Sequence, residues 1–458
     1  MPKAKTGFFC TECGNETPRW QGQCPACGAW NSLAEEPLAR TQKKARAAGA
    51  RKGDAAAAAS APVRLRDVEG GGAERWRTGL DEFDFVLGGG VVPGSLVLVG
   101  GEPGIGKSTL LLQVAARLES AGHPTLYVSG EESAAQVRLR ADRLGDGAGD
   151  VVFLTETDLD DVLSHAHTGH PASLFIDSIQ TVYWPELEGA PGNVTQVREC
   201  AARLQRFAKD TGTAVFLVGH VTKGGTVAGP KTLEHIVDTV LYFESTSGLD
   251  HRVLRATKNR FGGVDEIGVF RMTAAGLVPV ENPSELFLEE RTHASGAAVV
   301  ATIEGSRPLL VEVQALCGRT SYGAPQRVST GFDRQRLALL LAVLEKRADI
   351  GFGQLDVFLN VVGGVRLIEP AGDLALVAAL ASSAFDREAP ADAVFVGEVG
   401  LGGELRTVGQ VERRLGEAAR MGFTRAYLPA RAVPKRPPDG LEPAGLRDVR
   451  ELVDRLFR

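Results

Sequence analysis

Short apolar runs alternate with amphipathic stretches from about residue 68 to residue 280. The runs have the length and composition of buried strands. Two longer stretches repeat their apolar residues with the spacing of a helix. Strands that alternate with helices predict an α/β fold, a parallel sheet covered by helices on both faces. The expected strands are 95–100, 125–130, 151–156, 173–178, 214–220 and 239–244, and the expected helices are 107–122 and 194–212.

The pattern changes after residue 280, where paired strands and separate helices predict a smaller α+β domain. We therefore divide the folded part of the chain into an α/β domain at 67–280 and a second domain at 281–458. The expected elements of the second domain are hairpins at 296–317 and 393–409, the latter with a glycine-rich turn, and helices at 333–348 and 371–385.

Residues 33–66 are rich in alanine, lysine and arginine and lack periodic apolar positions, which predicts a flexible basic linker. A solvated tether fits this composition better than a dedicated DNA-binding arm. The whole chain has a formal net charge of -6, so any contact with nucleic acid must come from a local patch.

The sequence gives no sign of a membrane partner. Its start, MPKAKTGFFC, lacks the apolar core of a signal peptide, and no apolar run is long enough to span a bilayer. We expect a cytoplasmic protein, in which cysteines are reduced thiols or metal ligands rather than disulfides.

Four of the six cysteines lie near the start of the chain, with the spacing C-x2-C-x10-C-x2-C. A C-x-x-C-G turn presents two thiolates to one metal, so two such turns complete a tetrahedral site. Four sulfur ligands leave no open position, which indicates a structural Zn²⁺ in a zinc ribbon at 1–32. Protein and DNA are both possible partners of this ribbon. The expected zinc ligands are Cys10, Cys13, Cys24 and Cys27.

The stretch GGEPGIGKST follows an expected strand and opens an expected helix, which is the context of a P-loop. Its glycines let the backbone approach phosphates, and the helix start presents free N–H groups to them. We expect ATP here, with Lys107 at the β- and γ-phosphates, Ser108 on Mg²⁺ and Thr109 near the α-phosphate. The expected nucleotide-binding residues are Gly101, Glu102, Pro103, Gly104, Ile105, Gly106, Lys107, Ser108 and Thr109.

Two further strand ends carry the acids that ATP hydrolysis needs. Asp177 ends the run SLFID and would complete the Mg²⁺ site. In YVSGEES, Glu131 and Glu132 follow the next strand, and we prefer Glu131 as the base that positions water; the alternative is that both acids cap the following helix. His220 ends VGH and either senses the γ-phosphate or is a passive polar residue.

The stretch ATKNRFGGVDEIGVF ends an expected strand with two cations, Lys258 and Arg260, before a glycine turn. Alternate residues of a strand share a face, so these two side chains would project together and Asn259 would point to the other side. On the sequence alone, a solvated strand end explains the pattern as well as an anionic target does.

In their order along the chain, these motifs resemble the bacterial RadA (Sms) family of DNA repair proteins over essentially the whole length. The four cysteines, GEPGIGKST, YVSGEES, GHVTKGGTVAGPKTLEHIVDTVLYFE and KNRFG carry the resemblance. The family implies a RecA-like ATPase core between a zinc ribbon and a Lon-protease-like domain. It also implies a hexameric ring that moves on single-stranded and branched DNA, branch-migrates recombination intermediates and works with the recombinase RecA.

The resemblance gives KNRFG a role in coupling ATP to DNA. In RecA-like rings ATP lies between protomers, and a cation from the next subunit stabilises the charge that develops on the transferred phosphate. Lys258 and Arg260 are assigned either to this role or to contacts in the central channel. The same signature includes Asn259, Phe261 and Gly262.

The glycine-rich loop 219–235 carries Lys223 and Lys231. In a RecA-like ring it would line the channel, where lysines meet DNA phosphates. It contains no aromatic residue, so base stacking is not expected. A surface loop with no ligand is the alternative.

The C-terminal domain departs from a working Lon protease, which uses a serine activated by a lysine. Ala371 stands at the serine position and Glu412 at the lysine position, so we expect no protease activity and interpret the domain as a scaffold. Exposed arginines could add a DNA-binding face: Arg319, Arg334, Arg336, Arg413 and Arg414.

Two other functions compete with a DNA motor. One is a RecA/KaiC-like signalling or assembly ATPase that never touches DNA. The other is an ATP-dependent peptidase, which the missing serine and lysine disfavour.

Overall fold

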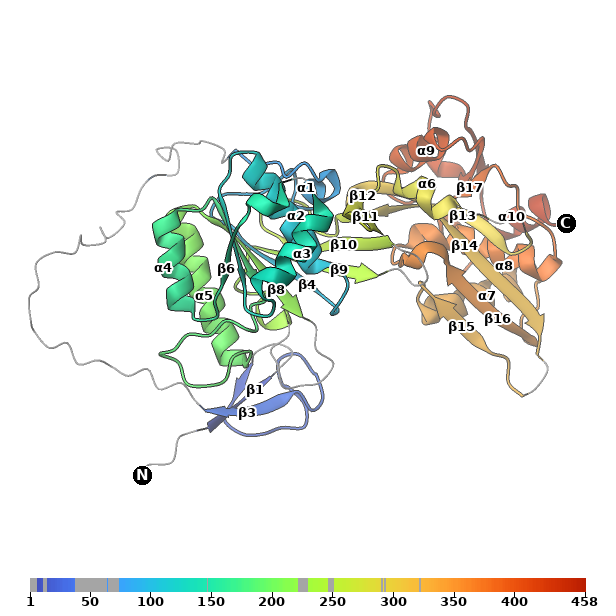
Figure 1. The fold of residues 1–458 in the computed structure, drawn as a ribbon. Coiled ribbons are helices and arrows are strands. Elements are labelled where there is room, and N and C mark those ends of the chain that lie inside the picture. Colours follow the sequence, from blue (N-terminus) through green and yellow to red (C-terminus); the bar gives the residue numbers. More distant parts are fainter. Residues whose placement is uncertain are drawn as a thin grey trace, which may run out of the picture. The chain divides into compact units, whose positions relative to one another are not determined.

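The computed structural model describes residues 6–10, 15–37, 64, 74–145, 147–220, 230–245, 251–289, 291, 294–320 and 323–458. The chain forms two compact units (Figure 1). The first contains residues 1–243, 256–262 and 274–277, and the second contains 244–255, 263–273 and 278–458. The division is therefore not a single cut near residue 280, because β10 (His251–Asn259) and β12 (Gly276–Pro279) each supply residues to both units.

A nine-stranded sheet has the strand order β12-β11-β10-β9-β4-β8-β7-β5-β6. Its strands β4 to β8 form the centre of the first unit, whereas β11 belongs to the second. The six strands from β9 to β6 are parallel, which confirms the predicted α/β core. These six are β4 (Leu96–Gly101), β5 (Thr125–Ser129), β6 (Val152–Thr155), β7 (Ser173–Asp177), β8 (Ala214–His220) and β9 (Thr239–Ser245); β11 (Ile267–Thr273) extends the other side.

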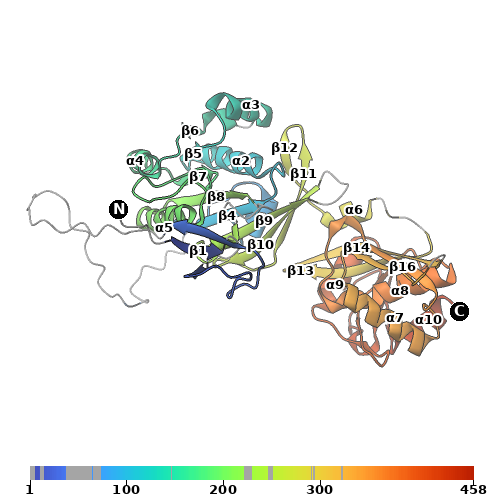
Figure 2. The same cartoon turned by 90° about the horizontal axis from the view of Figure 1, so that it is seen from below.

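Helices cover both faces of this sheet (Figure 2). On one face α4 (Leu159–Gly169) and α5 (Val194–Thr211) pack their apolar residues against β4, β7 and β8. On the other face α2 (Lys107–Ser120) contacts β5, β7 and β8. The unit also contains α1 (Asp81–Val86) and α3 (Ala134–Leu144). This layering places the carboxyl ends of β4, β5, β7 and β8 at one edge.

The four-cysteine segment forms a small sheet of order β2-β1-β3. Its strands are β1 (Thr6–Cys10), β2 (Glu16–Thr17) and β3 (Leu33–Pro37). Among its described residues, the apolar cluster consists of buried Cys10, Cys24 and Leu33, with Phe8 packed against them. So small a cluster cannot supply the folding free energy of the segment alone.

A seven-stranded sheet of order β15-β16-β14-β13-β17-β20-β21 forms the second unit. Residues from α7, α8 and α10 share one core cluster with it, and those from α9 share another. Its strands are β13 (Ala297–Glu304), β14 (Arg307–Arg319), β15 (Arg327–Thr330), β16 (Leu355–Val361), β17 (Ala393–Phe395), β20 (Arg425–Pro429) and β21 (Glu442–Leu446). Its helices are α6 (Pro283–Leu288), α7 (Arg334–Ala348), α8 (Asp373–Phe385), α9 (Val411–Arg420) and α10 (Val449–Leu456).

The predicted hairpin at 296–317 forms as β13 and β14, and the hairpin predicted at 393–409 forms only over its later part. β17 joins the large sheet between β13 and β20. The glycine-rich turn instead connects a separate two-stranded hairpin of β18 (Glu398–Val399) and β19 (Leu405–Arg406). The apolar run of β17 is stabilised better inside the sheet than in a local pair.

A buried ion pair ties three segments of the second unit together. The guanidinium of Arg414, in α9, bonds both carboxylate oxygens of Glu369 at 2.6 Å. Arg414 also donates to the carbonyl of Ala301, and Glu369 accepts from Thr302 Oγ1 and the amide of Ile303. Burial opposes the ionisation of Glu369, but these hydrogen bonds outweigh it and lower the pKa of Glu369.

Glu369→Gln should destabilise the second unit by about 3–5 kcal/mol, because it leaves the guanidinium of a buried arginine uncompensated. The matched control is Asp454→Asn, which breaks an exposed pair with Arg458 and should cost about 1 kcal/mol or less. All four tryptophans of the chain, Trp20, Trp30, Trp76 and Trp184, lie in the first unit. Urea unfolding followed by circular dichroism should therefore shift in Glu369→Gln, while tryptophan emission should not; equal effects of both variants would contradict the prediction.

Candidate nucleotide site and zinc ribbon

The P-loop connects β4 to α2 and wraps back over the start of the helix. Gly101, Gly104 and Gly106 all have positive φ, which other residues rarely adopt. A Cβ at Gly101 would lie 2.7 Å from the carbonyl oxygen of Phe243, so only glycine fits there. The expected loop residues Glu102, Pro103 and Ile105 stand between these glycines.

Lys107 is the first residue of α2 and is 3% exposed. Its Nζ donates to the carbonyl oxygens of Gly101 and Glu102, each at 2.9 Å. Burial lowers the pKa of Lys107, and the charges of Asp177 and Glu131 act in the opposite direction. The ammonium group is therefore held inside the loop by acceptors that a phosphate can replace.

Asp177 ends β7 and is buried beside Ser108, whose hydroxyl makes a hydrogen bond with it. Burial raises the pKa of Asp177, while hydrogen bonds from Tyr127 and Ser108 favour the ionised form. A hydroxyl and a carboxylate in contact form a hard oxygen donor set, which fits Mg²⁺. Ser108 and Asp177 are therefore the residues that would hold this ion.

Glu131 and Glu132 are adjacent in the chain but have different partners. Glu131 accepts a 2.5 Å hydrogen bond from Ser178 Oγ and lies 3.4 Å from Nε2 of His220. The contact with His220 and the hydrogen bond from Ser178 lower the pKa of Glu131 to about 2, against the effect of burial. Glu132 instead pairs with Arg140 of α3 at 2.7 Å. This arrangement favours Glu131 over Glu132 as the base.

The KNRFG segment lies near the amino end of β4, whereas the P-loop follows the carboxyl end of this strand. Lys258 Nζ donates to the carbonyls of Glu234 and Val237, which precede β9. Arg260 pairs with Asp238 at 3.2 Å, and Asp238 in turn accepts from the amide of Leu96, where β4 begins. β4 then runs to Gly101 before the P-loop starts, a length of about 17 Å.

The rest of this segment is anchored in the first unit. Asn259 is buried, and its amide contacts Thr239 and the carbonyl of Val86. The carbonyl of Phe261 accepts from Arg75, and Gly262 packs against the backbone of Gly88. Asn259 is thus turned inward, whereas Lys258 and Arg260 both reach the connection that leads into β9.

The glycine-rich loop is described at its two ends, residues 219–220 and 230–235. Lys223 lies outside the described residues, whereas Lys231 is exposed in a short 3₁₀ helix at Pro230–Thr232. This helix precedes the carbonyls that Lys258 contacts. The KNRFG segment and the end of the loop are therefore neighbours.

The zinc ribbon brings together the described members of its cysteine set. The sulfurs of Cys10, Cys24 and Cys27 all lie within 4.8 Å of one another. The amides of Cys10 and Cys24 donate to the carbonyls of Asn15 and Ala29, which closes two similar turns. Cys13, the fourth expected ligand, lies outside the described residues. Three convergent sulfurs fit a zinc site.

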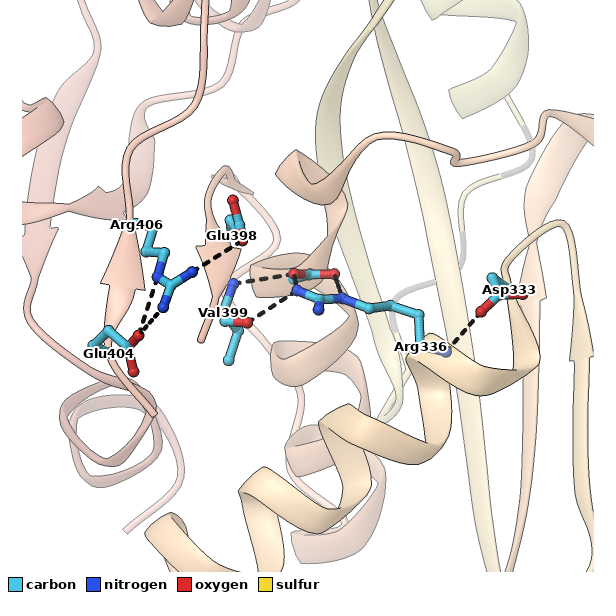
Figure 3. A network of polar contacts seen from close by, with 7 residues as sticks. Asp333, Arg336, Glu398, Val399, Glu404 and Arg406 are labelled. Carbon is cyan, nitrogen blue, oxygen red and sulfur yellow. Dashed lines mark hydrogen bonds and ion pairs between the residues drawn. The ribbon is translucent and has the colours of Figure 1, made fainter. Parts of the chain in front are cut away.

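In the second unit, a short 3₁₀ turn at Pro370–Gly372 precedes α8. Ala371, which the sequence analysis aligned with the serine of a Lon protease, is buried, and Glu412, which it aligned with the lysine, is exposed. Close by, Arg336 of α7 bonds the fully buried carboxylate of Asp373 and the carbonyl of Val399 (Figure 3). The amide of Val399 donates to the same carboxylate at 3.0 Å.

These contacts also correct the expected basic face of the second unit. Arg336 and Arg414 are paired with Asp373 and Glu369, so they cannot add free positive charge to it. Burial of charges requires such partners, and sequence position alone does not reveal them.

Two site residues were missed by the sequence analysis, Tyr127 and Ser178. Both donate hydroxyl groups to the predicted carboxylates. Tyr127 reads as an ordinary strand residue and Ser178 as the start of a turn. Only the pairing of β5 with β7 brings them to their partners.

Within the part of the chain that the structure describes, no helix combines the length and apolar character needed to cross a bilayer.

The fold and this site define the class: a P-loop ATPase with a RecA-like core, attached to a ribbon that fits zinc. Family models agree, since residues 78–226 match the AAA domain and residues 8–35 match the rubredoxin metal binding domain. The DNA repair protein RadA of Bacillus subtilis (strain 168) is 49% identical over 99% of both chains. That of Pseudomonas aeruginosa is 50% identical, and that of Streptococcus pyogenes serotype M1 48% identical, each over 100% of both chains. The chain therefore belongs to the RadA family of DNA repair proteins.

Glu131→Gln should lower the turnover number for ATP by about 100-fold or more while ATP still binds, because it removes the carboxylate that positions water. Glu132→Gln is the matched control and should change turnover by only about twofold, since Glu132 serves its pair with Arg140. Steady-state turnover and equilibrium nucleotide binding check both variants. A larger loss in Glu132→Gln than in Glu131→Gln would reverse the assignment.

Cys24→Ser should release zinc and unfold the ribbon, because metal binding supplies on the order of 10 kcal/mol to such a segment. Zinc content per chain and the emission of Trp20 and Trp30 measure the loss. Cys317→Ser, in β14 of the second unit, is the control and should retain full zinc. Undiminished zinc in Cys24→Ser would show that the metal site is elsewhere.

Proposed function

We propose that this protein is an ATP-driven motor on DNA that acts in recombinational repair. It would assemble as a hexameric ring in the cytoplasm, move on single-stranded and branched DNA and branch-migrate recombination intermediates alongside the recombinase RecA. The family resemblance supplies these expectations, and its curated relatives carry the name DNA repair protein.

The observation that supports the proposal is the distance between two groups of cations at opposite ends of the parallel strands. Lys107 lies at the carboxyl edge of β4, and Lys258 and Arg260 lie beside its amino end, about 17 Å away. Their side chains cannot reach the phosphates bound by the same subunit. In a ring, Lys258 and Arg260 of one protomer would instead reach the nucleotide of the adjacent protomer or line the central channel.

The residues at the carboxyl ends of the parallel strands have separate roles in ATP hydrolysis. Lys107 offers a positive charge to the β- and γ-phosphates once they replace its backbone acceptors. Bound Mg²⁺ would neutralise phosphate charge at Ser108 and Asp177. Glu131, ionised at neutral pH, accepts a hydrogen bond from the attacking water and orients it. His220 contacts Glu131 and is the last residue of β8, which leads into the glycine-rich loop. It would therefore couple the presence of the γ-phosphate to the loop that carries Lys223 and Lys231.

A signalling or assembly ATPase that does not touch DNA is the second candidate, and the overall charge of -6 favours it. Turnover with and without single-stranded DNA separates the two functions. A motor should show stimulation that falls steeply as salt rises. Lys107→Ala should abolish turnover in both cases, which excludes a contaminating ATPase.

Lys258→Ala should leave nucleotide binding within about twofold of the native protein, because Lys258 is remote from the P-loop of its own subunit. DNA-stimulated turnover and branch migration should fall by about 100-fold or more, as expected when a trans cation is lost. Lys209→Ala, an exposed lysine at the end of α5, is the matched control and should behave as the native protein.

The contacts of Lys258 with two carbonyls suggest a competing structural role in holding the turn before β9. The melting temperature separates this role from the proposed one. Unchanged branch migration by Lys258→Ala would remove Lys258 from the mechanism.

A further inference from the structure

Two hydrogen bonds at the nucleotide site connect a hydroxyl group of one strand or strand end to a carboxylate of the neighbouring one. β5 and β7 are parallel partners, with Ser129 opposite Asp177. Tyr127 of β5 donates its hydroxyl to Asp177 Oδ2 of β7 at 2.7 Å. Ser178, which follows β7, donates its hydroxyl to Glu131, which follows β5. Each strand therefore supplies the donor for the other strand's carboxylate.

The tyrosine hydroxyl of this pair is held rigidly. Tyr127 is fully buried, and its ring stacks on Phe175 with centroids 5.9 Å apart and on Phe153 at 6.3 Å. A ring fixed by such packing presents its hydroxyl in one direction. Because Tyr127 occupies one carboxylate oxygen of Asp177, it restricts rotation of that carboxylate, which also contacts Ser108.

The serine hydroxyl holds a side chain that would otherwise be free to move. Glu131 is 42% exposed on its side chain, whereas Ser178 is fully buried. The 2.5 Å hydrogen bond from Ser178 therefore anchors a half-exposed carboxylate to the core. Without this donor, the remaining contact is His220 at 3.4 Å, a distance too long to fix one orientation.

We infer that Tyr127 and Ser178 are positioning residues, each of which orients a different carboxylate of the site. Tyr127 orients Asp177 toward Ser108 and so sets the affinity of the site for its divalent cation. Ser178 orients Glu131 and so sets the rate of hydrolysis. This inference rests on the proposed ATPase site, and goes beyond it by assigning the two parameters to two different hydroxyls.

The test uses the full-length protein and the variants Tyr127→Phe and Ser178→Ala. ATP turnover is measured as a function of Mg²⁺ concentration, and binding of a fluorescent ADP analogue is measured with and without Mg²⁺. Loss of one hydrogen bond to a charged group corresponds to an effect of about tenfold or more. Tyr127→Phe should raise the Mg²⁺ concentration for half-maximal turnover by about that factor and weaken analogue binding only when Mg²⁺ is present. Ser178→Ala should lower turnover at saturating Mg²⁺ by a similar factor and leave the half-saturating Mg²⁺ concentration unchanged.

Matched controls remove the same groups elsewhere in the first unit. Tyr242→Phe deletes a hydroxyl that contacts Glu234, and Ser120→Ala deletes one that contacts the carbonyl of Ala116. Both should leave the two parameters unchanged. Melting temperatures of all four variants show whether a change reflects loss of folding.

Three outcomes would overturn the inference: both site variants shift the same parameter, neither shifts any, or analogue binding weakens equally with and without Mg²⁺. The binding experiment does not depend on turnover. Absence of ATPase activity in the native protein would therefore refute the proposed function, while the Mg²⁺-dependent binding of Tyr127→Phe would still decide the role of Tyr127.

Discussion

The alignment of four parallel strands is the constraint on which the nucleotide site depends. β4, β5, β7 and β8 end at the same edge, and there they place the P-loop, Glu131, Asp177 and His220. None of these groups is close to the others in sequence. A slip of one residue in the pairing of β5 with β7 would turn Tyr127 away from Asp177 and take both crossed hydrogen bonds with it. The chemistry of the site is thus a property of strand register as much as of residue type.

The same sheet keeps its two sets of positive charge apart. Lys107 is buried at the carboxyl edge, and Arg260 is half-exposed beside the amino end of β4. Asp238 holds Arg260 near the amino end of β4, because its carboxylate accepts from the amide of Leu96 and pairs with Arg260. Close packing of the helices on both faces of this sheet keeps the distance between the two sets of cations fixed within one subunit.

The sequence predicts the parallel core well, since each of its six strands is a compact apolar run bounded by turn residues. It misses α3 and α4, although Ser133 with Gln136 forms a capping box and Asp158 caps α4. Both helices have only 11 residues, fewer than α2 with 14 or α5 with 18, so each offers few repeats of the apolar period. The P-loop and the four-cysteine pattern are local motifs and can be recognised by spacing. The roles of Tyr127 and Ser178, and the pairing of Arg336 with Asp373, depend on contacts between distant segments, which periodicity cannot reveal.

Charged side chains beside α8 illustrate how ion pairs specify the packing of the second unit. At the start of α8, methyl-bearing Ala371 is buried, and the polar groups nearby are committed to each other. Asp373 is bonded by Arg336 and Val399, and Glu369 by Arg414 and by Ile303 near the end of β13. Asp373 and Glu369 are each bonded by groups from other elements, which fixes the orientation of both carboxylates. Buried pairs of this kind contribute little net stability compared with apolar packing, but breaking one is costly. They therefore fix which helix lies against which strand within the second unit.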